Sequence, residues 1–238
     1  MDKETLETNP QLSVVVPVYN ESATVVQAVE RLRSMLSDFR TEILIVDDGS
    51  TDGTTEQVRN LESMQDVSVF YHAKNQGKGA ALRTAFSQTR GEVVVIQDAD
   101  FEYDPQDIPR LIQPILGGHA DVVFGSRFRG ESQRVHLFWH RVANGLLTLA
   151  SNMMTNLNLT DMETGYKAFS GDVVKRFTIR ENRFGVEPEL TAKVAKLKCR
   201  VYEVPISYYG RDYSEGKKIG FRDAVRAAWC IVRYRIAN

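Results

Sequence analysis

Two aspartates, Asp98 and Asp100, stand one residue apart directly after the apolar run 93–96. Carboxylates in this position have three interpretations. They could cap the following helix, although Asp104 is better placed for that role. They could form an acid–base pair, although both would ionise at a polar rim. They could also bind a divalent metal, because Mg²⁺ takes one or two protein carboxylates together with phosphate oxygens and water.

The elements that would position this pair alternate between strands and helices. Runs of β-branched residues and helical apolar spacing follow one another from residue 12 to residue 127. Ser22 is a possible N-cap of the first helix. The alternation predicts an α/β domain with a mostly parallel, doubly wound sheet. The predicted strands are 12–18, 42–48, 67–72, 91–98 and 120–127, and the predicted helices are 21–39, one after the turn 49–54, 77–89 and 105–116.

Polar residues follow each predicted strand. In open α/β sheets, ligands bind beyond the carboxyl ends of the strands. The residues found there are Asn20, Glu21, Asp47, Asp48, Lys74, Asn75, Asp98, Asp100, Ser126 and Arg127. After residue 127 the pattern changes to an amphipathic stretch at 135–156, an edge strand at 198–209 that contains Pro205, and a basic amphipathic helix at 217–236.

Composition narrows the class of protein. The chain has 238 residues, 42% of them hydrophobic, and a net charge of −1, which fits one large globular domain and not a dedicated nucleic-acid binder. Two cysteines outside any metal-ligand spacing fit a reducing cytoplasm. There is no signal-peptide pattern and no apolar run of about 18 residues. We therefore expect a protein that is soluble or lies on a membrane surface.

Five segments occur in an order typical of one enzyme family. They are VVVPVYNES (14–22), ILIVDDGSTDGT (43–54), NQGKGAALRTAF (75–86), VIQDADFEYDP (95–105) and VVFGSRF (122–128). Over residues 12 to about 218 the chain resembles the family 2 glycosyltransferases. The resemblance implies the GT-A fold with an acceptor-side C-terminal extension. It divides the chain into a polar tail (1–11), a glycosyltransferase domain (12–220, with a nucleotide-sugar half to 127 and an acceptor half from 128) and a basic C-terminal helix (221–238).

The resemblance also implies a donor site for a nucleoside-diphosphate sugar. The Asp-x-Asp pair would hold Mg²⁺ or Mn²⁺ bridging the donor diphosphate, with Glu102 as a possible further ligand. The lysine of the Gly-Lys-Gly turn would lie near the nucleotide. The implied donor-site residues are Pro17, Tyr19 and Glu21, which frame the base and ribose, Asp47 and Asp48, which contact them, Lys78, and the metal-binding Asp98 and Asp100.

The C-terminal half resembles the polyprenyl-phosphate glycosyltransferases of the dolichyl-phosphate mannose or glucose synthase type. The segments DMETGYKAFS (161–170) and YYGRDYSEGKKIG (208–220) carry this likeness. It implies an inverting transfer of a hexose, mannose or glucose, to a lipid phosphate. Cations would hold that phosphate, namely Arg127, Arg211 and either Lys217 or Lys218. The expected catalytic residues are Asp100, Arg127, Arg211 and Lys217. Each of these cations could instead be an ordinary surface charge.

A saccharide or small-molecule hydroxyl acceptor is the alternative, and it would need a carboxylate base. Glu187 and Glu189 are candidates, unless they only favour a helix N-terminus. A nonenzymatic nucleotide-sugar-binding protein is a third possibility. A nicotinamide-dependent oxidoreductase is disfavoured because no G-x-G-x-x-G follows the first strand.

A lipid acceptor implies contact with a membrane. Residues 136–154 could form an interfacial helix, or a core helix that covers the acceptor pocket. The basic helix 221–238 is a second candidate for the membrane surface. These features predict a peripheral protein at the cytoplasmic face of the membrane, with a membrane protein as a possible partner.

Overall fold

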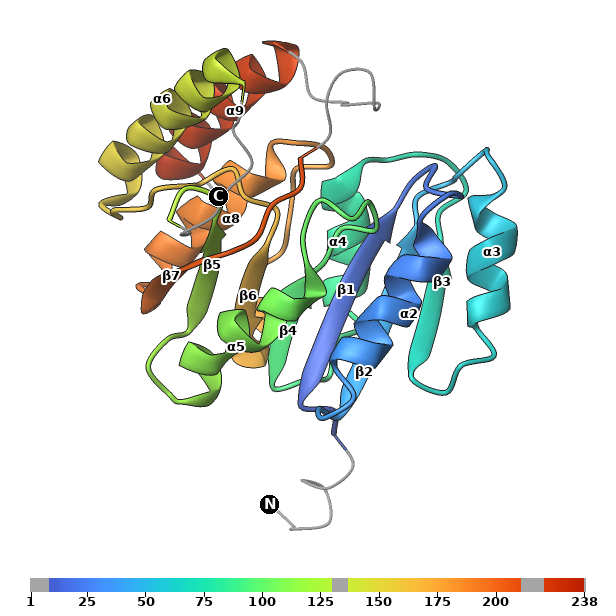
Figure 1. Cartoon of the computed structure of the whole chain (residues 1–238). Helices are drawn as coiled ribbons and strands as arrows, with labels where there is room; N and C mark the ends of the chain where they lie inside the picture. Colours follow the sequence, from blue (N-terminus) through green and yellow to red (C-terminus); the bar gives the residue numbers. More distant parts are fainter. Residues whose placement is uncertain (1–8, 130–136, 211–220, 238) are drawn as a thin grey trace.

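The computed structural model describes residues 9–129, 137–210 and 221–237. Within these residues seven strands form one sheet in the order β3-β2-β1-β4-β6-β5-β7 (Figure 1). The strand pairs are parallel except for the two that involve β6, which runs antiparallel to both β4 and β5. The strands are β1 (Leu12–Val18), β2 (Thr41–Asp47), β3 (Val67–Tyr71), β4 (Val93–Ile96), β5 (Val122–Ser126), β6 (Lys167–Ser170) and β7 (Val201–Pro205).

Helices cover both faces of this sheet, as the doubly wound pattern predicted. One core cluster packs α2, α3 and α5 against the sheet, and a second packs α4, α7 and α8 against its other face. Alternation along β1 shows the two faces, because Val14 and Val16 enter the first cluster and Val15 the second. The described helices are α2 (Val25–Met35), α3 (Thr54–Leu61), α4 (Lys78–Phe86), the 3₁₀ turn η1 (Pro105–Asp107), α5 (Ile108–Leu116), α6 (Phe138–Thr155), α7 (Gly171–Lys175), α8 (Val186–Lys196) and α9 (Phe221–Ile236).

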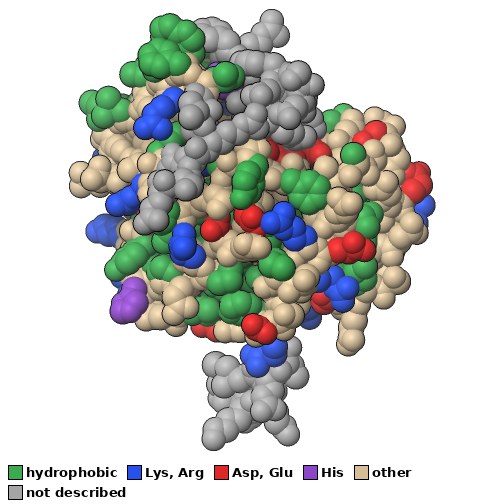
Figure 2. Space-filling view, viewed as in Figure 1, with side chains coloured by type: hydrophobic (Ala, Val, Ile, Leu, Met, Phe, Trp, Pro, Cys, Tyr) green, Lys and Arg blue, Asp and Glu red, His purple; other side chains and the backbone are tan. Residues whose placement is uncertain are grey.

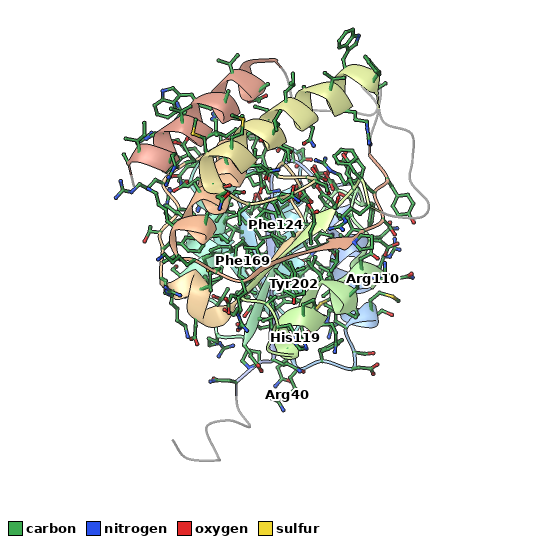
Figure 3. The ribbon with its side chains drawn as sticks, turned by 90° about the vertical axis from the view of Figure 1, so that its left-hand side faces the viewer. Arg40, Arg110, His119, Phe124, Phe169 and Tyr202 are labelled. Carbon is green, nitrogen blue, oxygen red and sulfur yellow. The ribbon has the colours of Figure 1, made fainter. Side chains whose placement is uncertain are left out.

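Helices α6 and α9 form a group beyond the sheet and pack against α8, which also covers one face of it. Helices α6, α8 and α9 pack on one another, and α6 and α9 lie side by side at one end of the molecule (Figures 1 and 3). Arg40 lies at the opposite end, and the labelled side chains of Phe124 and Phe169 lie in the interior between these two ends (Figure 3). The group is therefore built onto the carboxyl ends of the strands, where the sequence places its polar residues.

One sequence expectation about local structure was wrong, and one strand was missed. Ser22 does not cap the first helix; Thr24 holds the N-cap position without a side-chain hydrogen bond, and the Ser22 N–H donates to Asp52 Oδ2 at 3.2 Å. Strand β6 was not predicted at all. It has four residues, too few for a period to be read, and it begins with a lysine. In contrast, Asp104 caps the turn before α5 as expected, since its side chain accepts from the Gln106 N–H, and β7 is an edge strand.

Candidate active site

A cavity of about 760 Å³ opens at the carboxyl ends of the strands. Nine of the residues that the sequence assigned to the donor, metal or acceptor-phosphate sites line this one cavity. They come from the ends of four different strands and from the start of α4, so they are far apart in sequence and close in space. These residues are Pro17, Tyr19, Glu21, Asp48, Lys78, Asp98, Asp100, Glu102 and Arg127. Arg211, Lys217 and Lys218 lie outside the described residues.

Lys78 reaches from the start of α4 into the carboxylates of the cavity. Its Nζ lies 2.8 Å from Asp98 Oδ2 and 3.7 Å from Glu187 Oε1. Burial alone would lower the pKa of this ammonium group, but the charges of Asp98 and Glu187 raise it above its ordinary value. The lysine therefore stays charged. Because it is the first residue of a helix, its charge adds to the N–H groups and dipole of that N-terminus, which together favour a bound anion.

The Asp-x-Asp segment is held in a specific conformation. Phe101, between the second aspartate and Glu102, has φ of +61°, a left-handed conformation that is uncommon for a large side chain. The Glu102 N–H donates to Asp100 Oδ1 at 3.1 Å, and the Tyr208 hydroxyl donates to Glu102 Oε2 at 2.8 Å. A strained backbone inside a hydrogen-bonded loop is a frequent feature of functional sites.

The described carboxylates suit a divalent cation only together with a substrate. No group of three or more His, Cys, Asp or Glu in the described ranges is arranged to hold a metal by itself. Asp98 and Asp100 nevertheless line the same cavity, and one or two carboxylates plus phosphate oxygens is the usual Mg²⁺ arrangement. The Tyr208 hydroxyl, the Lys78 ammonium group and the Glu102 N–H engage one oxygen each, of Glu102, Asp98 and Asp100 respectively, so these contacts do not separate the three carboxylates as metal ligands.

The two aspartates that end β2 are used inside the protein. Asp47 accepts hydrogen bonds from the Ser50 N–H at 3.0 Å and the Thr55 hydroxyl at 2.6 Å, is 1% exposed, and is not among the residues that line the cavity. Asp48 lines the cavity, but it also accepts from the Gly77 N–H at 2.6 Å and contacts His72 Nδ1. Both carboxylates position loops, and for Asp47 the structure shows no route to a nucleotide.

Arg127 forms a two-point ion pair that fixes one wall of the cavity. Its Nε and Nη2 each lie 2.7 Å from the carboxylate of Asp161, which is completely buried, and its guanidinium lies over the ring of Tyr208. Burial opposes the charge of both groups, yet the opposite charges raise the pKa of Arg127 and lower that of Asp161. The pair is therefore ionised, with the guanidinium fixed along one edge.

The two glutamates proposed as bases lie in different places. Glu189 is fully buried, accepts from the N–H groups of Arg180 and Glu181, and is not a lining residue. Glu187 lines the cavity, but its carboxylate contacts both Lys78 and the buried Lys167. This arrangement gives a chain of alternating charges, Asp98–Lys78–Glu187–Lys167, that runs from the cavity into the protein.

Sequence reasoning missed two residues of this site as individual functional groups. Glu163 lines the cavity and Lys167 lies beneath it, both from the segment 161–170. A lysine at the start of an otherwise apolar strand was the signal for Lys167, because a buried lysine must be paired. Glu163 gave no such signal, since an acidic residue in a loop is unremarkable.

Helix α6 has two different faces. Trp139, His140, Ala143, Asn144 and Leu147 line the cavity, so α6 covers the site. Yet Phe138, Trp139, Leu146, Leu149 and Met153 are 57–76% exposed. Trp229 and Val232 of the adjacent α9 are 47% and 46% exposed. In Figure 2, apolar side chains stand out at the upper left, where Figure 1 places α6 and α9. No helix in the described part of the chain is long and apolar enough to cross a membrane.

The fold and the cavity define an α/β protein with a doubly wound sheet and a cavity at the carboxyl ends of its strands, where open sheets of this kind bind their ligands. Solved structures agree on the fold. Crystal structures of glucosyl-3-phosphoglycerate synthase from Mycobacterium tuberculosis, with Mn²⁺, UDP and glucosyl-3-phosphoglycerate or with Mg²⁺ and UDP, align over 99% of this chain and 83% of theirs. The TM-score is 0.72 for both, with sequence identities of 21% and 22%. The predicted GT-A fold is thereby confirmed.

Residues 13–178 match the family Glycosyl transferase family 2, and the chain belongs to that family. An undecaprenyl-phosphate mannosyltransferase of Micrococcus luteus is 31% identical over 87% of this chain and 86% of its own length. A dolichol-phosphate mannosyltransferase of Pyrococcus furiosus and the hexosyltransferase Agl6 of Haloferax volcanii are each 29% identical, over 88% and 96% of this chain. The chain spans 60% and 54% of the lengths of these two relatives.

Proposed function

We propose that this glycosyltransferase moves a hexose from a nucleoside-diphosphate sugar to a polyprenyl phosphate, with inversion and with Mg²⁺ or Mn²⁺. The observation that carries the donor half of the proposal is the ion pair of Lys78 with Asp98 in a cavity that also holds Asp100. A cation and two carboxylates at a helix N-terminus suit a metal-bound diphosphate. The names of the undecaprenyl-phosphate and dolichol-phosphate relatives support the acceptor half.

Each side chain has a role in this proposal. Asp98 and Asp100 hold the cation, which when bound would offset the charge that develops on the departing diphosphate. Lys78 and the first N–H groups of α4 meet the same charge from the other side. Pro17, Tyr19 and Glu21 form the part of the cavity wall where the base and ribose would lie. Asp48 orients the segment before α4 through its hydrogen bond with Gly77.

The cationic side chains of the site fit a phosphate acceptor better than its carboxylates fit a hydroxyl acceptor. A phosphate monoester is already anionic and needs no strong base, whereas a hydroxyl acceptor does. Both oxygens of the Glu187 carboxylate contact lysine ammonium groups, so a hydroxyl would have to displace one of them. Arg127 lines the cavity and keeps the planar donor geometry that binds phosphate. Arg211, Lys217 and Lys218 remain proposed ligands of the acceptor phosphate.

The exposed apolar face of α6 and α9 would rest on the membrane that carries the acceptor. Large apolar side chains on both helices are exposed, and Arg226 and Arg233 flank Trp229 with their guanidinium groups 4.6 and 4.8 Å from its ring centre. Exposed aromatic and basic side chains together favour an interface with anionic lipid. The same helix α6 lines the cavity, so a docked face would bring the lipid phosphate to the site. We propose a peripheral protein at the cytoplasmic face.

A donor and acceptor panel tests the proposal. UDP- and GDP-linked glucose and mannose, radiolabelled in the sugar, are each offered with a short polyprenyl phosphate or with soluble saccharides, with Mn²⁺ present. We expect label in the organic phase that mild acid releases as free sugar. Label that enters only a water-soluble glycoside contradicts the acceptor assignment. Donor binding without any product supports a nonenzymatic binding protein and contradicts the proposed transfer.

A further inference from the structure

Glu163 places a carboxylate in the wall of the cavity with one oxygen unused. The residue lines the cavity, and its Oε1 has almost no solvent-accessible area and no hydrogen-bond partner among the described residues. Buried polar atoms are nearly always hydrogen-bonded, and an exception calls for an explanation such as a ligand that supplies the partner. In the described ranges, three other buried side-chain atoms lack a hydrogen-bond partner. Of the residues that carry them, only Asn144 also lines the cavity.

The surroundings of Glu163 are strongly charged. Burial and the negative charge of Glu187 raise the pKa of its carboxyl to about 8, although Lys167 and Arg127 act in the opposite direction. A carboxyl group beside other carboxylates destabilises the protein unless something compensates. The unmet Oε1 in this charged wall therefore points to a ligand that supplies a hydrogen-bond donor.

The position of the segment relates Glu163 to the donor. Gly165 follows two residues later, and a Cβ on it would lie 2.8 Å from both Asp98 Oδ2 and Lys78 Nζ. The backbone thus passes directly against the two groups expected to face the donor diphosphate. A hexose on the terminal phosphate of that diphosphate extends one sugar ring away from them. Glu163 lines the same cavity as Lys78 and Asp98 and stands two residues before Gly165 in this segment, so the donor hexose would enter the part of the cavity that this segment lines.

We infer that Glu163 is a specificity-determining residue whose Oε1 accepts a hydrogen bond from a hydroxyl group of the donor hexose. The inference rests on the proposed function, since it needs a sugar nucleotide in the cavity. Oε1 can accept a bond from a hydroxyl whether the carboxyl is ionised or carries its proton on the other oxygen. Hydroxyl groups of a hexose supply the donors that the protein leaves unmet at this atom.

The sharpest test compares the affinity for a donor with the affinity for the same nucleoside diphosphate without sugar. Calorimetry on the full chain would give both dissociation constants for wild type, E163Q, E163A and the control E92A, which changes the exposed glutamate immediately before β4. We expect E163A to bind the nucleoside diphosphate as wild type does and the sugar nucleotide about 10- to 100-fold more weakly, with a smaller loss in E163Q, because leaving a desolvated hydroxyl without its partner costs on this scale.

Deoxy and deoxyfluoro donors identify the hydroxyl. For wild type, removal of the contacted hydroxyl should cost about as much as E163A does, and for E163A the same removal should cost little further. Equal sugar-nucleotide affinity in wild type, E163Q and E163A overturns the inference, as does a loss that affects nucleoside diphosphate and sugar nucleotide alike. These outcomes are separate from the acceptor assignment, because an enzyme that glycosylates only soluble acceptors can still show the expected donor discrimination.

Discussion

The ammonium group of Lys78 lies 2.8 Å from Oδ2 of Asp98, and both side chains are about one-fifth exposed to the cavity. This pair joins the start of α4 to the loop after β4. A donor diphosphate would contact both of these elements. A cation that binds Asp98 must therefore accommodate a positive neighbour, which it can do when phosphate oxygens come with it. Under the proposed function, Mn²⁺ should therefore bind more tightly when the donor is present.

Replacing Lys78 by alanine should lower kcat/KM about 10²- to 10³-fold, the scale seen when one preorganised electrostatic donor is removed. The loss follows because the leaving diphosphate would meet one positive charge less. The measurement is steady-state transfer with the best donor from the panel. Lys74→Ala, which removes an exposed lysine four residues earlier, serves as the control. Similar kinetics for both variants would show that Lys78 is only a structural partner of Asp98.

Asp100→Asn should abolish the effect of Mn²⁺ on donor binding. With wild type, we expect the nucleoside-diphosphate sugar to bind more tightly as Mn²⁺ is added and the effect to disappear with EDTA. The variant should bind the donor weakly at every Mn²⁺ concentration, since one of two carboxylate ligands is lost. Asp66→Asn, at an exposed ion pair with Arg33, should behave like wild type. A full Mn²⁺ response in Asp100→Asn contradicts the assigned metal ligand.

Asp161→Asn should destabilise the protein by about 3–5 kcal/mol, because it leaves the Arg127 guanidinium buried without its counter-charge. In a chain of this size, each kcal/mol corresponds to a Tm shift of about 2–4 °C. Thermal and urea denaturation would give the value. The comparison is Arg33→Ala, which removes an exposed pair of the kind that contributes at most about 1 kcal/mol. Equal Tm changes in the two variants would show that the buried pair is not needed for stability.

The Glu163 carboxyl should contribute a loss of stability as the pH rises from about 5 to about 8. Its pKa is about 8 in the folded chain and 4.5 as the ordinary value, so the folded state binds more protons than the unfolded state over this window. More bound protons in the folded state means that rising pH reduces the free energy of unfolding. The groups that face Glu163 electrostatically are Glu187, Lys167, Arg127 and Asp161.

Glu163→Gln removes that titration. The Tm of the variant should therefore rise relative to wild type as the pH increases from 5 to 8, with the two proteins most alike at the acid end. Scanning calorimetry without ligand, at several pH values and constant ionic strength, gives the difference. A Tm difference that stays constant across the window would show that the carboxyl titrates normally.

Trp139→Ser and Trp229→Ser should each weaken binding to vesicles that contain phosphatidylglycerol by about 10-fold or more, because burial of one large apolar side chain contributes about 1.5–3 kcal/mol. Co-sedimentation at several lipid concentrations gives the partition coefficients. Tyr202→Ser, an exposed aromatic on the edge strand β7, is the matched control. Unchanged partitioning in both tryptophan variants would show that the face formed by α6 and α9 does not meet lipid.

The sequence predicted the sheet of the first half well because parallel, buried strands appear as short continuous apolar runs. Val93–Ile96 is such a run, and the structure makes it β4. Strand β6 could not be found in this way. Its four residues lie between β4 and β5 because they pair with these two strands, which come much earlier in the sequence. No local sequence pattern encodes such a partner.

The candidate site shows the same division. Asp98 and Lys78 were singled out by motif and position, and both line the cavity. The motif alone assigns the Asp47 carboxylate to a ligand. In the structure this carboxylate instead accepts hydrogen bonds from the Ser50 N–H and the Thr55 hydroxyl. Glu163 acquires its unusual environment only when α8 brings Glu187 beside it, and such proximity is a product of tertiary packing.

The insertion of β6 between β4 and β5 has a consequence for how the chain is made. Among the described strands, β5 pairs only with β6 and β7, which both come later in the sequence. A nascent chain that has emerged only as far as Arg127 therefore holds a strand with no neighbour, and the edge of β4 stays open until residues 167–170 arrive. During synthesis, β4 and β5 would therefore both present unpaired edges until the same short segment, β6, pairs with them. A ribosome pause or a proteolytic nick within that interval would expose them to aggregation.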